Sequence, residues 1–287
     1  GQQAVLGTLG EIADLAGQAG VEPPAVTVVG AVAGLGQALA WLEARPLHGQ
    51  VVAVTRARAQ ASELAARLRS LGAEAIEAPA IRIEPREVSL DGIEDYELVC
   101  FTSPNGVRLL FDALARDGRD ARALAGATVA SIGPGTAAEL ERRGISADVV
   151  PERSVAEALV EDLHGIDVEG RRALVARAAE ARDVLPDALR ERGAEVDVVA
   201  LYDTVAEPLD EQARARLERA SYVTFTSSST VRFFLEAGGR VPETARIAWI
   251  GPVTSATARE RGLDVHVEAE RHDIEGLVEA LVRDVAR

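Results

Sequence analysis

The sequence predicts an α/β protein with two parallel sheets and a cleft between them. Three observations support this prediction: short β-branched runs alternate with helical patterns, the chain repeats itself at long range, and two extended segments interrupt the alternation. Alternating strands and helices are typical of parallel sheets that helices cover on both faces. Ligands bind such sheets at the carboxyl ends of the strands, so the loops at those ends are the candidate functional loops.

The expected strands are short apolar runs with helical patterns between them. In the first half they cover 51–55, 74–83, 98–102, 128–132 and 147–150, and in the second half 172–176, 195–202, 222–226, 246–250 and 264–268. Helices are expected at positions such as 59–71 and 104–116, because apolar residues recur there at helical spacing. Glycines that follow the helical patterns suit the left-handed residue at which many helices end.

Three pairs of segments match one another across the chain. The matches are "GQVVAVTRARA" (49–59) with "GRRALVARAAE" (170–180), "LVCFTSPNGVRLLFDAL" (98–114) with "YVTFTSSSTVRFFLEAG" (222–238), and two Gly-Pro loops that start at Gly133 and Gly251. The starting positions of the three pairs are 121, 124 and 118 residues apart. This near-constant spacing indicates a duplicated unit of about 120 residues, far longer than the repeats of solenoid proteins.

Two extended segments connect the parts of the chain. "AIRIEPREV" (80–88) and "LYDTVAEPL" (201–209) both reach a Glu-Pro pair. Proline stops a central strand and favours an extended residue before it. Two connectors that cross one boundary predict a hinge. Residues 1–48 differ from the rest, because they predict only a helix, a strand and a second helix, too little to bury a core alone.

Composition narrows the classes of function. The chain has 287 residues, 47% of them hydrophobic, and a net charge of −15, which disfavours binding to nucleic acid or anionic membranes. The single cysteine, Cys100, lies in an apolar run and is expected to be buried, so no disulfide framework or zinc cluster is expected. No apolar run approaches the length of a membrane span, and the first residues lack the features of a signal peptide. We therefore expect a cytoplasmic protein without a metal site.

The two Gly-Pro loops are candidate anion sites. Gly133 and Gly251 stand where a strand turns into a helix, and Thr136 and Thr254 add hydroxyl groups. A helix N-terminus binds carboxylate or phosphate through its free backbone N–H groups. The alternative is a plain tight turn with a capping threonine. Val253 replaces the second glycine of the first loop, so the pattern is not a dinucleotide fingerprint.

Other candidate residues also lie at expected strand ends. The hydroxyl residues are Thr102, Ser103, Thr226, Ser227 and Ser228, and the arginines are Arg56, Arg177 and Arg182. The hydroxyl groups contact a ligand or simply cap helices, whereas arginine can clamp a carboxylate or remain solvated. Tyr202 begins the second connector, where a phenol could act as a proton donor or merely pack on a lobe. None of the four histidines lies in a matched loop, and all four are expected at the surface.

Several motifs together resemble the uroporphyrinogen-III synthase family. They are "VTRARAQASELAARLRSLGAEAIEAPAI", "FTSPNGVRLLF", "IGPGTAAEL", "LYDTVAEP", "FTSSSTVRFF" and "IGPVTSATARERGL", and the likeness covers 49–287. Residues 1–48 resemble the C-terminal tail of a uroporphyrinogen-III C-methyltransferase. The sequence departs from the family at Ala57, where proline often follows Thr-Arg, and at 176–182, which lacks a common glycine.

The resemblance implies a fold, a reaction and residue roles. It implies two flavodoxin-like lobes, formed by 49–84 with 205–287 and by 86–203, joined by a two-stranded connector. It implies that hydroxymethylbilane is dehydrated and closed to uroporphyrinogen III with its last ring inverted, without a cofactor and without S-adenosylmethionine binding here. Tyr202 matches the family's tyrosine and is expected to assist the loss of water.

The other candidates match the family's loops by position. Thr136 and Thr254 match its Gly-Pro threonines, Ser103 and Ser227 match its two serines, and Arg182 resembles a common arginine. Hydroxymethylbilane synthase or the fused methyltransferase would be the candidates for substrate channelling. A two-lobed binding module for anionic ligands without catalysis remains the alternative, ahead of a nucleotide-dependent enzyme.

Overall fold

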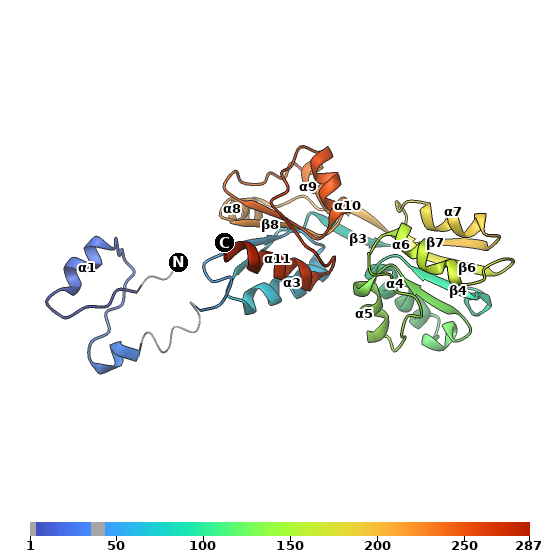
Figure 1. Cartoon of the computed structure of the whole chain (residues 1–287), viewed down its shortest axis with the longest axis horizontal. Coiled ribbons are helices and arrows are strands. Elements are labelled where there is room, and N and C mark those ends of the chain that lie inside the picture. Colours follow the sequence, from blue (N-terminus) through green and yellow to red (C-terminus); the bar gives the residue numbers. More distant parts are fainter. Residues whose placement is uncertain (1–3, 36–43) are drawn as a thin grey trace.

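The chain folds around two five-stranded sheets. The computed structural model describes residues 4–35 and 44–287. Within these ranges each sheet is flanked by helices, and an N-terminal segment lies apart from both (Figure 1). The mixed α/β class predicted from the sequence is confirmed.

The first sheet combines the beginning of the core sequence with its end. Its strand order is β10-β9-β8-β1-β2, and all its pairings are parallel. The strands are β1 (Val51–Val54), β2 (Glu74–Glu77), β8 (Tyr222–Phe225), β9 (Arg246–Trp249) and β10 (Val267–Glu268). The helices around it are α3 (Arg58–Ser70), α8 (Glu211–Leu217), α9 (Ser228–Glu236), α10 (Pro252–Glu260) and α11 (Ile274–Val285).

The second sheet takes up the middle of the chain. Its strand order is β3-β7-β6-β4-β5, and only the β3–β7 pairing is antiparallel. The strands are β3 (Ile81–Pro85), β4 (Leu98–Phe101), β5 (Thr128–Ser131), β6 (Arg172–Ala178) and β7 (Glu195–Ala206). The α-helices are α4 (Pro104–Arg116), α5 (Pro134–Arg142), α6 (Ala156–Asp162) and α7 (Val184–Glu191), and the short 3-10 helices are η2 (Ile93–Asp95), η3 (Ala121–Leu124) and η4 (Leu163–Gly165).

Strands β3 and β7 form a ladder that runs from one sheet toward the other (Figure 1). Ile81 lies opposite Ala206, and Pro85 lies opposite Tyr202. These strands are the two connectors expected from the Glu-Pro segments. The expectation of one strand over 74–83 was wrong. Pro79 separates β2 from β3, because proline cannot donate a ladder hydrogen bond at the point where the chain leaves the first sheet.

The cores lie between the sheets and their helices. In α4 the apolar residues Val107, Leu110, Phe111 and Leu114, which recur at helical spacing, are all buried. In the first sheet Phe225 stacks on Trp249 with ring centroids 5.0 Å apart. Cys100 is also fully buried, as expected, and burial raises the pKa of its thiol to about 12. A thiol with such a pKa stays protonated and is a packing residue.

Both predicted outer strands are shorter than expected. Residues 147–150 make only one isolated bridge, between Ala130 and Val149, and 264–268 reduces to the two residues of β10. In each case a side chain accepts the hydrogen bond of a strand N–H: Asp148 Oδ2 accepts from Val129 at 2.7 Å, and His266 Nδ1 accepts from Ile247 at 3.2 Å. These side chains replace ladder bonds, so the strands end early.

Residues 4–35, the described part of the N-terminal segment, include no buried residue. They contain α1 (Ile12–Gln18) and the 3-10 helix η1 (Ala31–Leu35). The strand expected between Pro23 and Gly30 was wrong, and most of the second expected helix lies outside the described residues. Leu9 is 77% exposed and Val26 is 91% exposed, so the segment adds nothing to either core.

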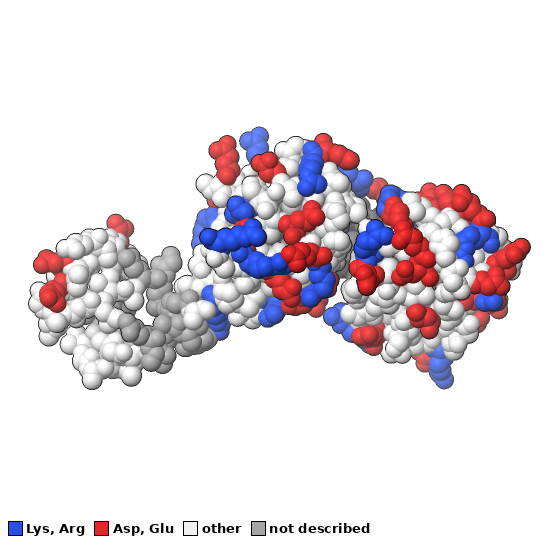
Figure 2. Space-filling view, in the orientation of Figure 1, with Lys and Arg blue, Asp and Glu red and all other residues white. Residues whose placement is uncertain are grey.

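The surface carries both signs of charge. On the face shown in Figure 2, acidic and basic side chains are interspersed over both sheet regions, while the N-terminal segment is mostly uncharged. No helix of the described ranges combines the length and the apolar character needed to cross a membrane.

Candidate functional site

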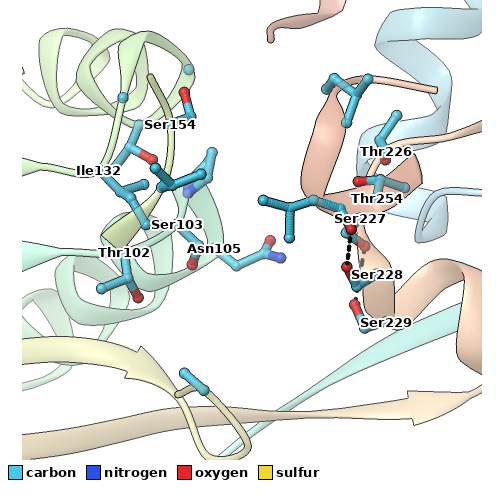
Figure 3. Close-up of a pocket in the computed structure, with 18 of the residues that line it drawn as sticks. Thr102, Ser103, Asn105, Ile132, Ser154, Thr226, Ser227, Ser228, Ser229 and Thr254 are labelled. Atoms are coloured by element: carbon cyan, nitrogen blue, oxygen red, sulfur yellow. Dashed lines mark hydrogen bonds between the residues drawn. The ribbon is translucent and has the colours of Figure 1, made fainter. Parts of the chain in front are cut away.

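One cavity of about 480 Å³ is lined by loops from both sheets. Every site residue predicted from the sequence lines it: Arg56, Thr102, Ser103, Gly133, Thr136, Arg177, Arg182, Tyr202, Thr226, Ser227, Ser228, Gly251 and Thr254. In Figure 3, Thr102, Ser103, Asn105 and Ser154 lie on one side of the cavity, and Thr226, Ser227, Ser228 and Thr254 lie on the other. The predicted loops therefore meet, although they come from separate parts of the chain.

The two Gly-Pro turns open two helices that lack a side-chain cap. Gly133 precedes α5 and Gly251 precedes α10, each with proline in the first turn and no side-chain hydrogen bond at the N-cap. The idea that Thr136 or Thr254 caps its helix was wrong, since both lie inside the helices and are almost fully buried. Two uncapped helix N-termini therefore border the cavity, where backbone N–H groups favour an anion.

Both turns require glycine because another segment packs against them. A Cβ atom on Gly133 would lie 2.0 Å from Ser154 Oγ and 2.8 Å from Ser154 Cβ. A Cβ atom on Gly251 would lie 2.8 Å from Cδ2 of His272. Ser154 and His272 are 118 residues apart, the same spacing as the two glycines, so the duplicated halves close over their turns in the same way.

The serine loops, in contrast, do cap their helices. Ser103 Oγ accepts a hydrogen bond from Gly106 N at 3.0 Å, and Ser227 Oγ accepts one from Thr230 N at 3.2 Å. The remaining contacts differ between the halves. Ser103 Oγ lies 2.8 Å from Tyr202 Oη, whereas Ser227 Oγ lies 3.0 Å from Ser229 Oγ and 2.6 Å from Thr230 Oγ1.

The arginines of the cavity are held in place. Arg177 is 8% exposed, and it donates to Arg182 O at 2.9 Å and to Asp183 Oδ1 at 2.6 Å. Its Nε atom is buried and has no hydrogen-bond partner, which leaves one donor for a ligand. Arg182 is exposed and paired with Glu157 at 2.6 Å. Burial lowers the pKa of Arg56, against the opposing effect of the Glu63 carboxylate.

Tyr202 lies where β7 leaves the parallel sheet. The register of β7 against β6 shifts between Arg177 and Ala178, so Ala178 pairs with Tyr202. Such irregularities often re-aim a side chain at a functional site. Burial raises the pKa of the Tyr202 phenol, while the hydrogen bonds with Ser103 and Asn105 and the charge of Arg108 act in the opposite direction. The phenol is 5% exposed and is protonated at neutral pH.

Several residues that line the cavity were not predicted from the sequence. Asn105, Ser154 and His272 all line the cavity. The expectation that every histidine lies at the surface was wrong for His48 and His272, which are half-buried. The 118-residue spacing could have found Ser154 and His272 as a pair. Asn105 follows Ser103 within the quoted "FTSPNG" loop, but its matched position carries serine, so the repeat gave no signal.

Comparisons with known proteins identify the family. The family model described as uroporphyrinogen-III synthase HemD matches residues 62–279, about three quarters of the chain. The chain belongs to the uroporphyrinogen-III synthase family. A uroporphyrinogen-III synthase from Synechococcus elongatus is 32% identical over 256 residues, covering 83% of this chain and 96% of the relative.

Two further similarities concern length and fold. The porphyrin biosynthesis protein HemD of Ruminiclostridium josui is 30% identical over 295 residues, which cover 98% of this chain and 58% of the relative. The chain thus spans less than two thirds of that protein. A crystal structure of a mutant uroporphyrinogen III synthase from Thermus thermophilus has a TM-score of 0.57 and 21% identity, covering 83% of this chain and 99% of that chain. This likeness confirms the α/β fold.

Proposed function

We propose that the chain dehydrates hydroxymethylbilane and closes it to uroporphyrinogen III with inversion of the last ring. The observation that carries this proposal is the single cavity in which both Gly-Pro turns, both serine loops and Tyr202 meet. Membership of the family and the names of its relatives support the same reaction.

The cavity suits a substrate with many carboxylates. The uncapped N-termini of α5 and α10 offer backbone donors from both sheets, and buried Arg177 keeps its Nε donor unpaired. These local donors act at short range, where they outweigh the net charge of −15 that solvent and salt screen. Arg56, Arg182, Thr102 and Thr226 complete the proposed substrate-binding set with the serines and threonines named above.

The reaction needs orientation more than strong chemistry. The hydroxymethyl oxygen must take a proton before it leaves as water, and the cation that remains is intrinsically reactive. The cavity then has to hold the linear chain so that the substituted carbon of the last ring is attacked, which is a problem of geometry. Tyr202, protonated at neutral pH, is the proposed proton donor for the first step. No cofactor takes part in this scheme.

We also propose a division of the chain that fits this reaction. Residues 49–84 with 205–287 form one flavodoxin-like lobe and 86–203 form the other, with the β3–β7 ladder as the hinge. The strand order β2-β1-β8-β9-β10 of the first sheet supports this, because it is the flavodoxin order. Residues 1–48 are proposed to be a methyltransferase tail. The Ruminiclostridium josui match supports a common extension, since it covers 98% of this chain and so reaches into that region.

The experiment that tests the function is an isomer assay. The chain is incubated with freshly made hydroxymethylbilane, and the oxidised porphyrin products are separated by chromatography. We expect isomer III as the main product, whereas the reaction without protein gives isomer I. Formation of isomer I alone would contradict the proposal. Tight binding of the tetrapyrrole without turnover would instead favour a binding module.

A further inference from the structure

Ser103 contacts a helix amide and a phenol through one oxygen. Its oxygen accepts from the backbone N–H of Gly106 at the start of α4, at 3.0 Å, and lies 2.8 Å from the Tyr202 oxygen. A hydroxyl group has one proton and two acceptor sites. The helix amide occupies one acceptor site of Ser103, and either oxygen of the Ser103–Tyr202 pair can be the donor. The N-terminal end of the α4 dipole favours the arrangement in which Ser103 donates its proton to the oxygen of Tyr202.

Asn105 is a second partner of the Tyr202 oxygen. Its side chain hydrogen-bonds to the phenol, and the amide N–H groups of asparagine can donate to that oxygen. In the arrangement in which Ser103 and Asn105 both donate to it, the proton of the phenol itself points in a third direction. Tyr202 lines the cavity, which is the direction open to it.

We propose that Ser103 is a positioning residue, which turns the phenolic proton of Tyr202 toward the cavity, with Asn105 as the second donor to the same oxygen. This assignment replaces substrate binding as the role of Ser103, and it rests on the proposed function. The matched Ser227 caps α9 in the same way but contacts Ser229 and Thr230 instead of a phenol. Ser227 therefore stays in the proposed binding set.

The proposed proton transfer begins at Tyr202. Tyr202 gives its proton to the hydroxymethyl oxygen, the carbon–oxygen bond breaks with its electron pair on the departing water, and a cation stays on the tetrapyrrole. Ser103 and Asn105 donate to the phenolate that remains. Attack on the substituted carbon of the last ring, which carries no hydrogen, gives a spiro intermediate. The bond from that carbon to its original bridging carbon then breaks and leaves a cation on the bridge. The unsubstituted carbon of the same ring bonds to the bridge and loses its proton, which restores the phenol. No oxidant, reductant or cofactor is required.

A cap-preserving substitution tests the proposal. Aspartate is as good a helix cap as serine but has no proton to donate. In Ser103→Asp the phenol must donate its proton to the new carboxylate, away from the substrate. We expect kcat to fall about tenfold, less than the roughly hundredfold or more that a general acid contributes, because the phenol itself remains. In protein labelled with ¹³C at tyrosine Cζ, we expect Tyr202 to titrate about one pH unit higher. Ser103→Thr keeps both cap and donor and should retain wild-type kcat and titration.

The matched control is Ser227→Asp, which places the same charge at the equivalent cap. Repulsion of substrate carboxylates should raise KM in both aspartate variants, but only Ser103→Asp should lower kcat and move the Tyr202 titration. In a Tyr202→Phe background, Ser103→Asp should cause no further loss of kcat, since positions that act through one group are not additive.

Three results would overturn the proposal. One is an unchanged Tyr202 titration in Ser103→Asp. Another is equal loss of kcat in the aspartate and threonine variants, which would indicate a merely structural role. The third is a further tenfold loss in the Tyr202→Phe background. The titration uses the free protein, so it remains decisive even if the isomer assay shows that the proposed function is wrong.

Discussion

The loop after β4 and the loop after β8 begin in the same way and end in different chemistry. Each starts its helix with a capping serine, Ser103 in one and Ser227 in the other, with the same extended backbone at the cap. One serine then contacts the phenol of Tyr202, and the other contacts a cluster of hydroxyl groups. The comparison teaches that duplication supplied a matched pair of helix starts, and that the contacts beyond the cap decide which half carries a reacting group.

The Gly-Pro turns make the opposite point, because there the two halves have remained alike. Both helices start without a side-chain cap, and both glycines lie under a covering residue, Ser154 in one half and His272 in the other. Our account therefore assigns binding to features that both halves share and the proton transfer to the feature that only one half has.

The largest expected effect comes from removing the group that distinguishes the halves. We expect Tyr202→Phe to lower kcat about a hundredfold with little change in KM, because a general acid is lost while the donors to carboxylates remain. Steady-state kinetics with analysis of the isomers measures this. In the wild type the rate should hold through neutral pH and fall only as pH rises through the raised pKa of the phenol. Equal rates in mutant and wild type would remove Tyr202 from the chemistry.

A smaller effect is expected from the arginines of the cavity. Arg177→Ala should raise KM about tenfold, because a buried charged donor is lost and Asp183 is left without its partner. Arg182→Ala should change KM by less than about twofold, since this exposed side chain is already paired with Glu157. A larger rise in KM for Arg182→Ala than for Arg177→Ala would contradict this assignment.

The Gly-Pro turns provide a test of stability with an internal control. Gly133→Ala should lower the free energy of unfolding by about 1 kcal/mol, because the new methyl group overlaps Ser154 and the loop must shift. A Cβ atom on Gly135 meets nothing within 4 Å, so Gly135→Ala should leave stability unchanged or slightly higher. Urea unfolding of the two variants measures the difference. A similar decrease in the free energy of unfolding for both variants would show that Ser154 is not tightly packed against Gly133.

The smallest expected effect concerns an ion pair between the two sheet regions. Arg232 on α9 contacts Glu180, in the loop after β6, at 2.6 Å, whereas the matched Arg108 pairs within α4 to Asp112 at 3.5 Å. The Arg232 pair links the two sheet regions whose loops line the cavity, so its loss should weaken binding of the product. Because both of its residues are partly exposed, we expect Arg232→Ala to lower the binding free energy of the product by only about 0.5 kcal/mol. Isothermal titration at low and high salt measures it. An effect that is independent of salt would contradict an electrostatic origin.

The sequence predicted what depends on repetition and local pattern. The spacing of the glycines and serines placed the loops at strand ends, and the two Glu-Pro segments predicted the two connectors that pair as β3 and β7. The predicted lengths of the strands at 147–150 and 264–268 were wrong because a side chain there replaces a backbone hydrogen-bond partner. Nothing in the apolar pattern of the sequence shows that Asp148 and His266 accept hydrogen bonds from neighbouring strands. Asn105 was not predicted either, because its contact with Tyr202 depends on a tertiary arrangement.

The most direct test of the account is a crystal structure of the chain with uroporphyrinogen III bound. We expect product carboxylates within hydrogen-bonding distance of the backbone N–H groups of Gly135 in α5 and Val253 in α10, with Tyr202 facing one of the rings. A product bound elsewhere, or bound in this cavity with its acid groups away from both helix starts, would contradict the claim that the duplicated turns hold the substrate.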